Sequence, residues 1–482
     1  MRVATAFSRL LRLPGVWVRS VKFEPGRVVV VVALRRQSLV CPKCSYSTRH
    51  RENQQHHDSV WRHLDLGVWR LEVHARLRRL RCPEHGVHVE GVPFARDGAR
   101  FTRDFEDLVA WLATKTDKTA TCRLTRIDWQ TIGRVIERVG DELLDGDRLG
   151  ELFAISIDEV SWRKGHRYLT LVGDHRRRCV VWGAEGKGKA AADKFFAELD
   201  PRVSGDDGSA CGTVGNPQGC PGAVDSSAGR GASFPQASGA APAPAQPVPV
   251  ASMPATPPEV QAEAPKVGER AAKLTAVSMD MGDGYAKSVR EHAPQAVICI
   301  DNFHVVQLAT KALDEVRREY WNELRRAGEG DEAKQFKDAR WSLLKNPEDL
   351  TERQAGTLAA LHAAGGKVPR AWGMKEMVRA IFAAGLSEDV VAELIKRLLS
   401  RLSRCRLKPF VRLGRTIRKH REGILAARRL NLSNARAEAL NNKVKLIVRR
   451  AYGFHSARAT LALVHLTCGP VTLALPHELV LT

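Results

Sequence analysis

The stretch that decides the fold of this chain is FAISIDEVSWRKGHRYLTLVGDHRRRCVVW, residues 153–182. Apolar segments separated by charged turns predict three β-strands in it, at 153–157, 168–172 and 179–182. Farther along the chain, helices are predicted at 190–199 and 285–292, and two more strands at 276–279 and 296–300. The order three strands, helix, strand, helix, strand predicts a mixed α/β domain.

Two aspartates directly follow strands of this domain. Asp158 follows the first strand in Ile155-Ser-Ile-Asp158-Glu159, and Asp280 follows the fourth in Val277-Ser-Met-Asp280. Because the first and fourth strands are neighbours in the topology of ribonuclease H, which has this order of elements, we expect the two carboxylates to lie side by side. Such carboxylates repel each other unless cations lie between them. Each aspartate alone could be a strand-end cap, but the pair predicts a two-metal site.

A single strongly marked helix is predicted near the C-terminus, from 433 to 452, with Ser433 or Asn434 as its cap and Gly453 at its end. Its predicted buried stripe consists of Ala437, Leu440, Val444, Ile447 and Ala451. A separate polar stripe consists of Glu438, Asn442, Lys445 and Arg449. A solvated helix surface would account for the polar stripe. However, a carboxylate followed by an amide and cations suits a helix that lies over a metal site and a phosphate backbone.

Two matched pairs of soft ligands occur in the N-terminal part, Cys41-Pro-Lys-Cys44 and Cys82-Pro-Glu-His85. Each pair spaces its ligands two residues apart on a tight turn, so the four side chains can surround one zinc ion tetrahedrally. The histidine-rich stretch between the pairs offers alternatives to His85, namely His50, His56, His57 and His63. A β-hairpin signal at Pro25-Gly26 places this predicted structural zinc site in a β-rich module.

Helical periodicity begins at residue 101, where Phe101, Phe105, Leu108, Val109 and Leu112 fall on one face. A second apolar face, Ile132, Val135, Ile136 and Val139, follows a break near residues 115–118. Short helices in tandem with a basic outer face predict a helix-turn-helix, with Arg134 and Arg138 as DNA contacts. A helical hairpin that only joins two domains is the alternative.

The expected architecture is a multidomain α/β protein. In chain order we expect a β-rich zinc-finger module (1–98), a helix-turn-helix region (99–145), a ribonuclease-H-like core (150–200 and 272–311) interrupted by a disordered insertion rich in Pro, Ala, Gly and Ser (201–271), an all-helical insertion domain (312–430), and a closing core helix with the C-terminal tail (431–482).

The net charge of the chain indicates which kind of molecule it binds. With 76 Lys and Arg against 54 Asp and Glu, the 482-residue chain carries a net charge of +22, which suits a nucleic acid. The longest purely apolar run, 28–34, is far too short to span a membrane, and no secretory signal is evident. Ten cysteines without an export signal indicate metal ligands or buried thiols. We therefore expect a cytoplasmic, nucleoid-associated protein without a membrane partner.

Several short motifs together resemble the ISL3 family of bacterial insertion-sequence transposases. They are the two zinc-ligand pairs, Ser156-Ile-Asp158-Glu159, Ser278-Met-Asp280-Met281, Asp301-Asn-Phe-His304-Val305-Val306, Trp341-Ser-Leu-Leu-Lys-Asn-Pro347, and Ser433-Asn-Ala-Arg-Ala-Glu438 running into Asn441-Asn-Lys443. The resemblance covers nearly the whole chain outside residues 201–265, and this insertion is its departure from the family.

The resemblance implies a DDE-type transposase that cuts and joins DNA. It implies that Asp158 and Glu438 are the first and last catalytic carboxylates and that Asp280 is the middle one, with Asp301 and His304 as supporting or alternative residues. It also implies two Mg²⁺ or Mn²⁺ ions on these carboxylates and one structural zinc ion. The implied partners are double-stranded DNA at the element ends and the target, with a homodimer or higher oligomer on DNA.

Three rival functions remain open on the sequence. A non-enzymatic zinc-finger DNA-binding regulator would use the charge and residues 41–139 but not the strand-end carboxylates. An inactive transposase remnant and a ribonuclease-H-type nuclease without strand transfer are the others. Strand transfer of pre-cut ends in magnesium would separate them.

Overall fold

The computed structural model describes residues 2–144, 146–163, 165–201, 269–382, 386–432, 435–451 and 453–478, with only the backbone described for Gln335 and for 435–438. The disordered insertion predicted at 201–271 therefore falls almost wholly outside the described residues. No helix in the described ranges is both long enough and apolar enough to cross a bilayer.

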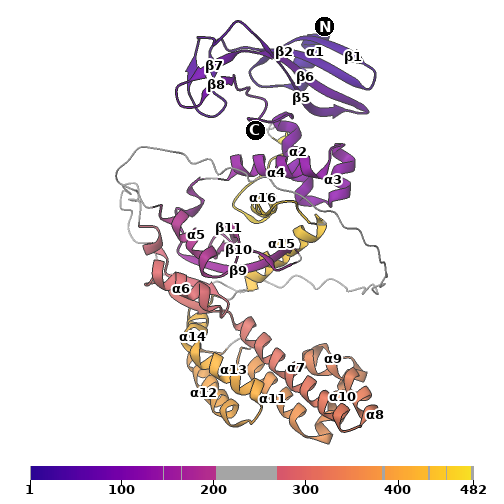
Figure 1. The fold of residues 1–482 in the computed structure, drawn as a ribbon, viewed down its shortest axis with the longest axis vertical. Helices are drawn as coiled ribbons and strands as arrows, with labels where there is room; N and C mark the ends of the chain where they lie inside the picture. The colour runs from indigo at the N-terminus through magenta and orange to yellow at the C-terminus, as the bar shows by residue number, and fades with distance from the viewer. Residues whose placement is uncertain are drawn as a thin grey trace, which may run out of the picture. The chain divides into compact units, whose positions relative to one another are not determined.

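The N-terminal module is built on a four-stranded sheet in the order β1-β2-β6-β5 (Figure 1). Its strands are β1 (Val16–Glu24), β2 (Arg27–Leu34), β5 (His57–Leu66) and β6 (Trp69–Leu77). The predicted hairpin at Pro25-Gly26 is confirmed, since β1 and β2 pair antiparallel across this turn and Gly26 has φ +76°. Helix α1 (Val3–Leu11), which was not predicted, packs on β1.

Two small ribbons extend from this sheet and carry the cysteine pairs. The first consists of β3 (Leu39–Val40) and β4 (Ser47–Thr48), and the second of β7 (Arg79–Cys82) and β8 (Gly86–Val89). Leu39, Cys41, Leu80 and Cys82 form a small buried cluster of their own. The two ribbons therefore share a core that brings the cysteine pairs together.

Three capped helices follow: α2 (Arg103–Lys115), α3 (Lys118–Thr125) and α4 (Trp129–Leu143). Thr102, Asp117 and Asp128 cap them by accepting backbone N–H bonds at their first turns. The predicted apolar faces are largely confirmed, because Phe105, Val109 and the four α4 residues are buried. Leu108 and Leu112 lie only partly buried at the edge of that face.

The central sheet has five strands in the order β11-β10-β9-β12-β13. They are β9 (Ala154–Arg163), β10 (Arg167–Asp174), β11 (Cys179–Glu185), β12 (Ala276–Met279) and β13 (Val297–Ile300). The first three form an antiparallel meander, whereas β12 is parallel to β9 and β13 is parallel to β12. With α5 (Lys189–Leu199) and α6 (Asp283–His292), the predicted order of elements is confirmed.

Strand β9 is longer than predicted. Asp158 does not end it; the strand runs five residues farther, to Arg163, in a hairpin whose last pair is Arg163 with Arg167. Parallel pairing with β12 does end beside Asp158, at Ile157 with Met279. Asp158 therefore lies at the carboxyl edge of the parallel part of the sheet, although its own strand continues.

The described segments between residues 302 and 429 are mainly helical. The helices are α7 (Asn302–Arg326), α8 (Gly330–Asp338), α9 (Arg340–Leu344), α10 (Glu352–Ala364), α11 (Lys367–Ile381), α12 (Glu388–Arg404), α13 (Lys408–Lys419) and α14 (Arg421–Arg429). Helix ends in this range lie next to Asn346-Pro347, Gly365-Gly366, Leu386-Ser387 and Lys408-Pro409. The domain boundary expected at 311/312 falls inside α7, which contains no helix-breaking residue there.

The C-terminal part holds two helices, α15 (Ala435–Arg450) and α16 (Ala457–Cys468). In the predicted α15 stripe, Val444, Ile447 and Ala451 are buried. Helix α16, expected to be part of a tail, is mostly buried and packs on α4 and β11. An alanine of α16, Ala462, approaches Gly140 of α4 so closely that a Cβ there would lie 3.2 Å from it.

The ends of the two segments that border residues 202–268 are tied together. Asp200, just after α5, accepts hydrogen bonds from the backbone N–H groups of Arg270 and Ala271, both at 3.2 Å. A short 3₁₀ turn, η2 (Ala271–Lys273), then leads into β12. The sheet is thus continuous across this interruption of the chain.

Candidate active site and metal centre

Three aspartates lie at one level of three adjacent strands. Asp158 follows Ile157 in β9, Asp280 follows Met279 at the end of β12, and Asp301 follows Ile300 at the end of β13. Ile157 pairs with Met279, and Met279 pairs with Ile300. The Asp301 N–H donates to the Met279 carbonyl at 3.1 Å. The carboxyl edge of the parallel strands therefore gathers three acidic residues, as the sequence predicted for two of them.

Asp158 is the most constrained of the three. One carboxylate oxygen accepts the Glu159 N–H at 2.6 Å, and the other accepts a hydrogen bond from the Asn441 amide of α15. Burial raises the pKa of Asp158, and the charge of Asp280 raises it further, while the Glu159 N–H, His304 and Asn441 lower it. The group would be stabilised as a carboxylate by added positive charge.

Asp280 and Asp301 have different surroundings. Asp280 is partly exposed, and one of its oxygens accepts the Gly282 N–H at 2.9 Å. Asp301 is only 7% exposed and caps α7, where it accepts the Phe303 N–H at 3.1 Å and lies 3.7 Å from His304 Nε2. Asp301 thus has a structural role as a helix cap, and Asp280 is the more accessible carboxylate.

Glu159 is a further acidic group at this edge. Its pKa is raised by burial and by the charges of Asp280 and Asp158. Tyr285 of α6 donates to its carboxylate at 3.4 Å. Asp158 and Glu159 are consecutive in β9, and the charge of Asp280, at the end of the neighbouring strand, raises the pKa of both. Glu159 belongs to the motif Ile155-Ser-Ile-Asp158-Glu159, but the sequence pattern predicts no role for it.

Helix α15 packs on β9, and the Asn441 contact fixes where it does so. Asn441 is only 8% exposed. Glu438 stands one helical turn before Asn441, and its side chain is not among those described. Asn442, Lys445 and Arg449 are exposed, as the polar stripe predicted. The predicted site residues therefore come from two adjacent strands and the helix that packs on them.

Asn441 is the residue that sequence reasoning missed. It was quoted with the family motif, but its neighbour Asn442 was assigned to the polar stripe. Both asparagines lie within one turn of Glu438 on the same side of the helix, so the sequence held no signal that separates Asn441 from Asn442.

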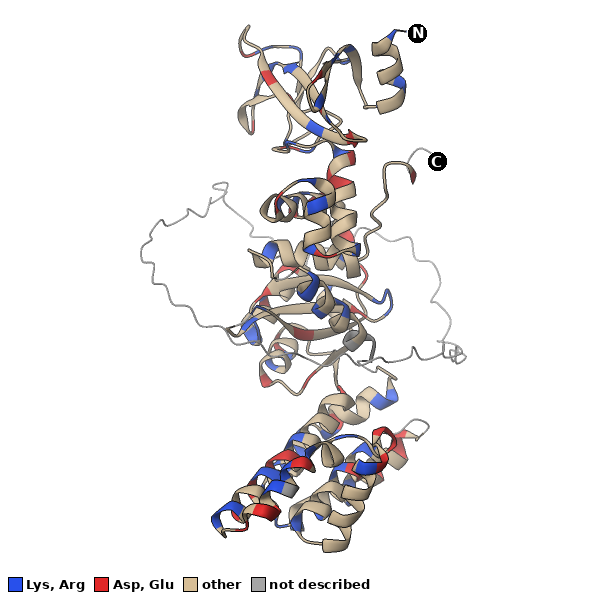
Figure 2. Cartoon of the chain, turned by 90° about the vertical axis from the view of Figure 1, so that its right-hand side faces the viewer, with Lys and Arg blue, Asp and Glu red and all other residues tan. Residues whose placement is uncertain are grey.

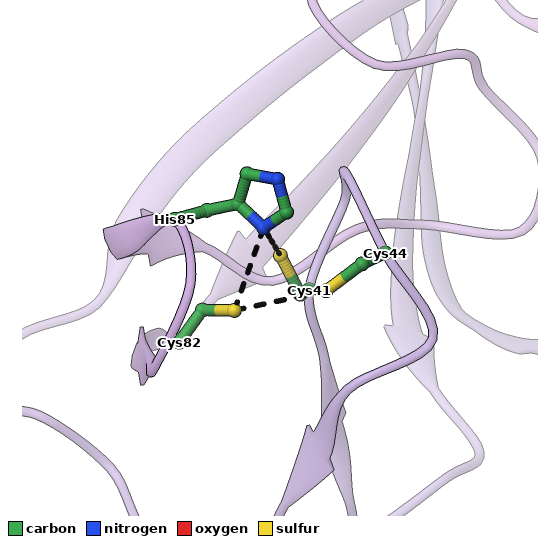
Figure 3. Close-up of side chains that lie close together, drawn as sticks. All are labelled: Cys41, Cys44, Cys82 and His85. Atoms are coloured by element: carbon green, nitrogen blue, oxygen red, sulfur yellow. Dashed lines mark hydrogen bonds between the residues drawn. The ribbon is translucent and has the colours of Figure 1, made fainter. Parts of the chain in front are cut away.

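Four ligand atoms converge between the two ribbons of the N-terminal module (Figure 3). Cys41, Cys44, Cys82 and His85 place their sulfur and nitrogen atoms all within 4.8 Å of one another. Cys44 Sγ lies 3.7 Å from Cys82 Sγ, and Cys82 Sγ lies 3.6 Å from His85 Nδ1. Tetrahedral zinc with Zn–S bonds of roughly 2.3 Å requires a sulfur–sulfur separation of about 3.8 Å. The four residues could hold such an ion.

Two of the four alternative histidines, His63 and His57, have other partners. His63 is buried, shares a 2.7 Å hydrogen bond with Thr102, and has its pKa lowered to about 4 by burial. His57 lies 3.0 Å from Ser59 on β5. Within the described residues, the group with Cys41 is the only set of three or more His, Cys, Asp or Glu ligands that comes together this closely.

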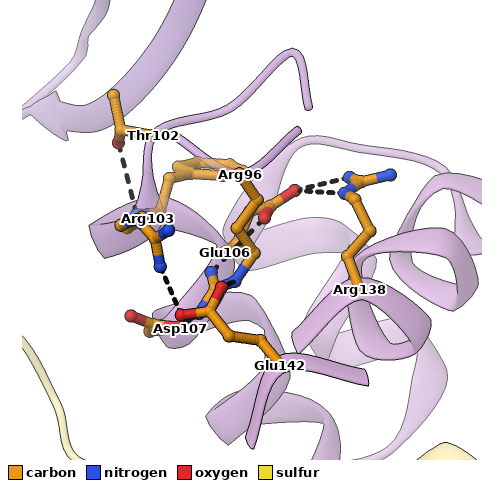
Figure 4. A network of polar contacts seen from close by, with 8 residues as sticks. Arg96, Thr102, Arg103, Glu106, Asp107, Arg138 and Glu142 are labelled. Atoms are coloured by element: carbon orange, nitrogen blue, oxygen red, sulfur yellow. Dashed lines mark hydrogen bonds and ion pairs between the residues drawn. The ribbon is translucent and has the colours of Figure 1, made fainter. Parts of the chain in front are cut away.

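A buried ion network joins the end of the N-terminal module to the helices (Figure 4). Glu106 of α2 has no exposed surface and accepts from Arg138 Nε at 3.0 Å, with Arg96 Nη1 at 3.4 Å. Arg96 also pairs with Asp107 at 2.7 Å and with Glu142 at 2.8 Å. Arg138, predicted as a DNA contact, is thus committed to Glu106, whereas Arg134 is exposed.

We predict that these two arginines differ in their effects. Arg138→Ala should lower the free energy of unfolding by roughly 1.5–3 kcal/mol, because it removes a hydrogen-bonded partner of a buried carboxylate. Arg134→Ala should leave stability unchanged and weaken DNA binding, with the salt-dependence slope reduced by about 1. Thermal unfolding and DNA titration at several salt concentrations measure both effects. Equal stability of the two variants would contradict this assignment.

The basic residues are spread over every described part of the chain (Figure 2). Many are paired, such as Arg412 with Glu315 and Lys419 with Asp283. The positive excess is therefore distributed over the protein and not confined to one segment, which suits contacts with an extended polyanion.

Comparisons with known proteins find a matching family over most of the chain. A family model described as a transposase matches residues 155–206 and 260–463, and a helix-turn-helix domain of transposase family ISL3 matches residues 90–140, which confirms the predicted helix-turn-helix. The chain is 34% identical over 460 residues to the transposase for insertion sequence element IS1557 of Mycobacterium tuberculosis, covering 91% of this chain and 88% of the relative. It is 23% identical over 437 residues to the transposase for IS1001 of Bordetella parapertussis, covering 89% of each.

Proposed function

Because this chain belongs to the ISL3 family of insertion-sequence transposases, we propose that it binds the terminal inverted repeats of its element and catalyses DNA cleavage and strand transfer. The observation that carries the proposal is the alignment of Asp158 and Asp280 on adjacent strands, with α15 attached to Asp158 through Asn441. The strand order and directions of the central sheet support a ribonuclease-H-like catalytic core.

Asp158, Asp280 and Glu438 are the proposed ligands of two Mg²⁺ or Mn²⁺ ions. Clustered, mutually repelling carboxylates are the donor set that hard divalent cations take, and the raised pKa of Asp158 fits a site that needs a cation. When bound, such ions activate the attacking oxygen and stabilise the leaving oxygen of an in-line phosphoryl transfer.

The remaining residues of this edge hold the carboxylates in place. Asn441 and the Glu159 N–H each occupy one Asp158 oxygen, which sets the rotation of that carboxylate. Asp301 anchors the start of α7, and His304 beside it lowers the pKa of Asp158. We therefore assign Asp301 and His304 supporting roles, and Asp280 the role of middle carboxylate.

DNA contacts are proposed on two parts of the chain. The helix-turn-helix contributes Arg134, and α15 contributes the exposed Asn442, Lys445 and Arg449. Cys41, Cys44, Cys82 and His85 are proposed to bind one structural zinc ion that holds the two ribbons together. A homodimer or higher oligomer is proposed as the active form on DNA, because both ends of an element must be joined.

The test of this function is strand transfer by purified protein. Pre-cut duplexes carrying the element's terminal repeat, a supercoiled target plasmid and Mg²⁺ should give joined products, and EDTA should prevent their formation. A DNA-binding regulator or inactive remnant would bind the repeat and give no product. A nuclease without strand transfer would nick DNA but not join it.

We predict that Asn441→Leu raises the Mg²⁺ concentration needed for half-maximal strand transfer, or lowers the maximal rate, by roughly 10–100-fold, because residues that orient metal ligands have effects of this size. Binding to the terminal repeat should be unchanged. Leu446→Ala, at an exposed position on the same helix, is the matched control. An unchanged metal dependence and rate in Asn441→Leu would show that the hydrogen bond to Asp158 has no positioning role.

A further inference from the structure

The tip of the β5–β6 hairpin is an exposed apolar projection. Leu66 pairs with Trp69, so Gly67 and Val68 form a two-residue turn, with Gly67 at φ +62°. Val68 is 77% exposed and Trp69 is 41% exposed. Large apolar side chains gathered on a projecting turn are unusual on a surface that contacts only water. Their position suggests a binding partner.

The tip is held against the turn of the helix-turn-helix. Arg126, between α3 and α4, donates to the carbonyls of Val68 at 3.3 Å and Gly67 at 3.5 Å. Arg62 of β5 donates in return to the Arg126 carbonyl at 3.4 Å. Asp65 lies 2.9 Å from Arg62 and 3.5 Å from Arg126, so one carboxylate joins both guanidinium groups.

The middle of the hairpin is attached to the same helices. The Arg62 N–H donates to the Arg100 carbonyl at 2.9 Å, and the Thr102 N–H donates to the Arg62 carbonyl at 3.0 Å. The His63 ring shares its 2.7 Å hydrogen bond with the Thr102 hydroxyl at the start of α2. The hairpin is therefore fixed to the three-helix unit at two places along its length.

This placement brings the tip to the end of α4 that approaches DNA. In helix-turn-helix proteins the N-terminal residues of the second helix contact base edges in the major groove. Here the turn that carries Arg126 directly precedes that end of α4, at Trp129. An element beside a helix in the major groove meets the sugar–phosphate backbone and the flanking minor groove, where proteins often insert apolar side chains.

The charge around the tip favours DNA over a protein partner. Arg70 directly follows Trp69, Arg126 contacts the tip, and both are exposed. Asp65 is the acidic partner that Arg126 and Arg62 share. Cationic side chains around an apolar tip are suited to DNA, because they can contact the phosphates on either side of a groove while the apolar side chains enter it.

We propose that the β5–β6 hairpin is a wing of the helix-turn-helix, and that Val68 and Trp69 contact the minor groove and backbone beside the major groove entered by α4. The proposal rests on the proposed function, because it requires the helix-turn-helix to bind DNA. It assigns to the N-terminal module a direct contact with DNA in addition to its structural role.

The test is a pair of footprints of the full-length protein on a duplex that carries the terminal repeat. Hydroxyl radicals report the sugars that line the minor groove, and dimethyl sulfate reports guanine N7 in the major groove. Val68→Asp with Trp69→Ser should remove hydroxyl-radical protection on one flank and retain dimethyl sulfate protection. The affinity should fall roughly tenfold or more, given the apolar surface that would be returned to water.

Val60→Asp is the matched control, because Val60 is an exposed valine on the same hairpin, 47% exposed and paired with His74 away from the tip. Zinc content and thermal unfolding of each variant verify that it is folded. Unchanged footprints and affinity in the double variant would overturn the wing. A change in oligomeric state with an unchanged footprint would also overturn it, in favour of a protein contact. No footprint by the wild-type protein would overturn both this proposal and the proposed function.

Discussion

Asp280→Ala is expected to eliminate strand transfer, whereas Asp301→Ala should only weaken it. Asp280 is the more accessible carboxylate at the end of β12 and acts electrostatically on both Asp158 and Glu159. Asp301 is buried and caps α7. Because positioned metal ions carry most of the catalysis of phosphoryl transfer, the loss in Asp280→Ala should span several orders of magnitude.

The comparison uses product formation from pre-cut ends in Mg²⁺, with repeat binding measured in parallel. Binding should be nearly unchanged in Asp158→Ala and Asp280→Ala, since these residues lie outside the helix-turn-helix. Asp301→Asn serves as the matched variant that retains an oxygen to cap α7. Retained activity in Asp280→Ala together with its loss in Asp301→Asn would make Asp301 the middle carboxylate.

Cys82→Ser is expected to release the metal and unfold the two ribbons of the N-terminal module. Structural zinc sites of this kind contribute about 10–16 kcal/mol of apparent binding free energy, and that energy is folding energy. Elemental analysis should give about one zinc per wild-type chain and much less in the variant. Proteolysis should then cut within residues 37–90.

Cys405→Ser is the control for loss of a thiol. Cys405 lies directly after α12, and its thiol donates to the backbone carbonyls of Leu402 and Leu407, far along the chain from the Cys/His cluster. This variant should keep its zinc. If Cys82→Ser retained both zinc and resistance to proteolysis, the assignment of Cys82 as a ligand would be wrong.

The sequence was sufficient to predict the positions of residues and strands where the local pattern and the topology agree. Apolar runs followed by an acidic residue located Asp158 and Asp280, and spacing located the two Cys/His pairs that converge in the structure. The length of β9 was harder to predict, since Glu159, Ser161 and Arg163 make its second half polar on one face. That half is held as a strand by pairing with β10, which is a tertiary effect.

Other features depend on contacts between distant segments. Glu106 lies in an amphipathic helix where a charge would ordinarily face water, yet its partners Arg96 and Arg138 come from a loop and from another helix. Whether Asn441 or Asn442 faces Asp158 depends on how α15 rotates against β9. Helix α16 is apolar on most sides, so it lacks the one-sided stripe by which a surface helix is recognised.

The hydrogen bonds that Asp200 accepts from Arg270 and Ala271 affect how the chain can change in length. Because Asp200 joins the end of α5 to Arg270 and Ala271, the two chain ends that flank residues 202–268 are neighbours in the folded protein. The entropic cost of a connection between ends that already meet grows only slowly with its length, by about 0.6 kcal/mol for each doubling. We therefore expect this position to tolerate insertions, deletions and exchanges of sequence while the central sheet keeps its register. A fluorescent reporter or affinity module inserted there should leave Asp158 and Asp280 in place.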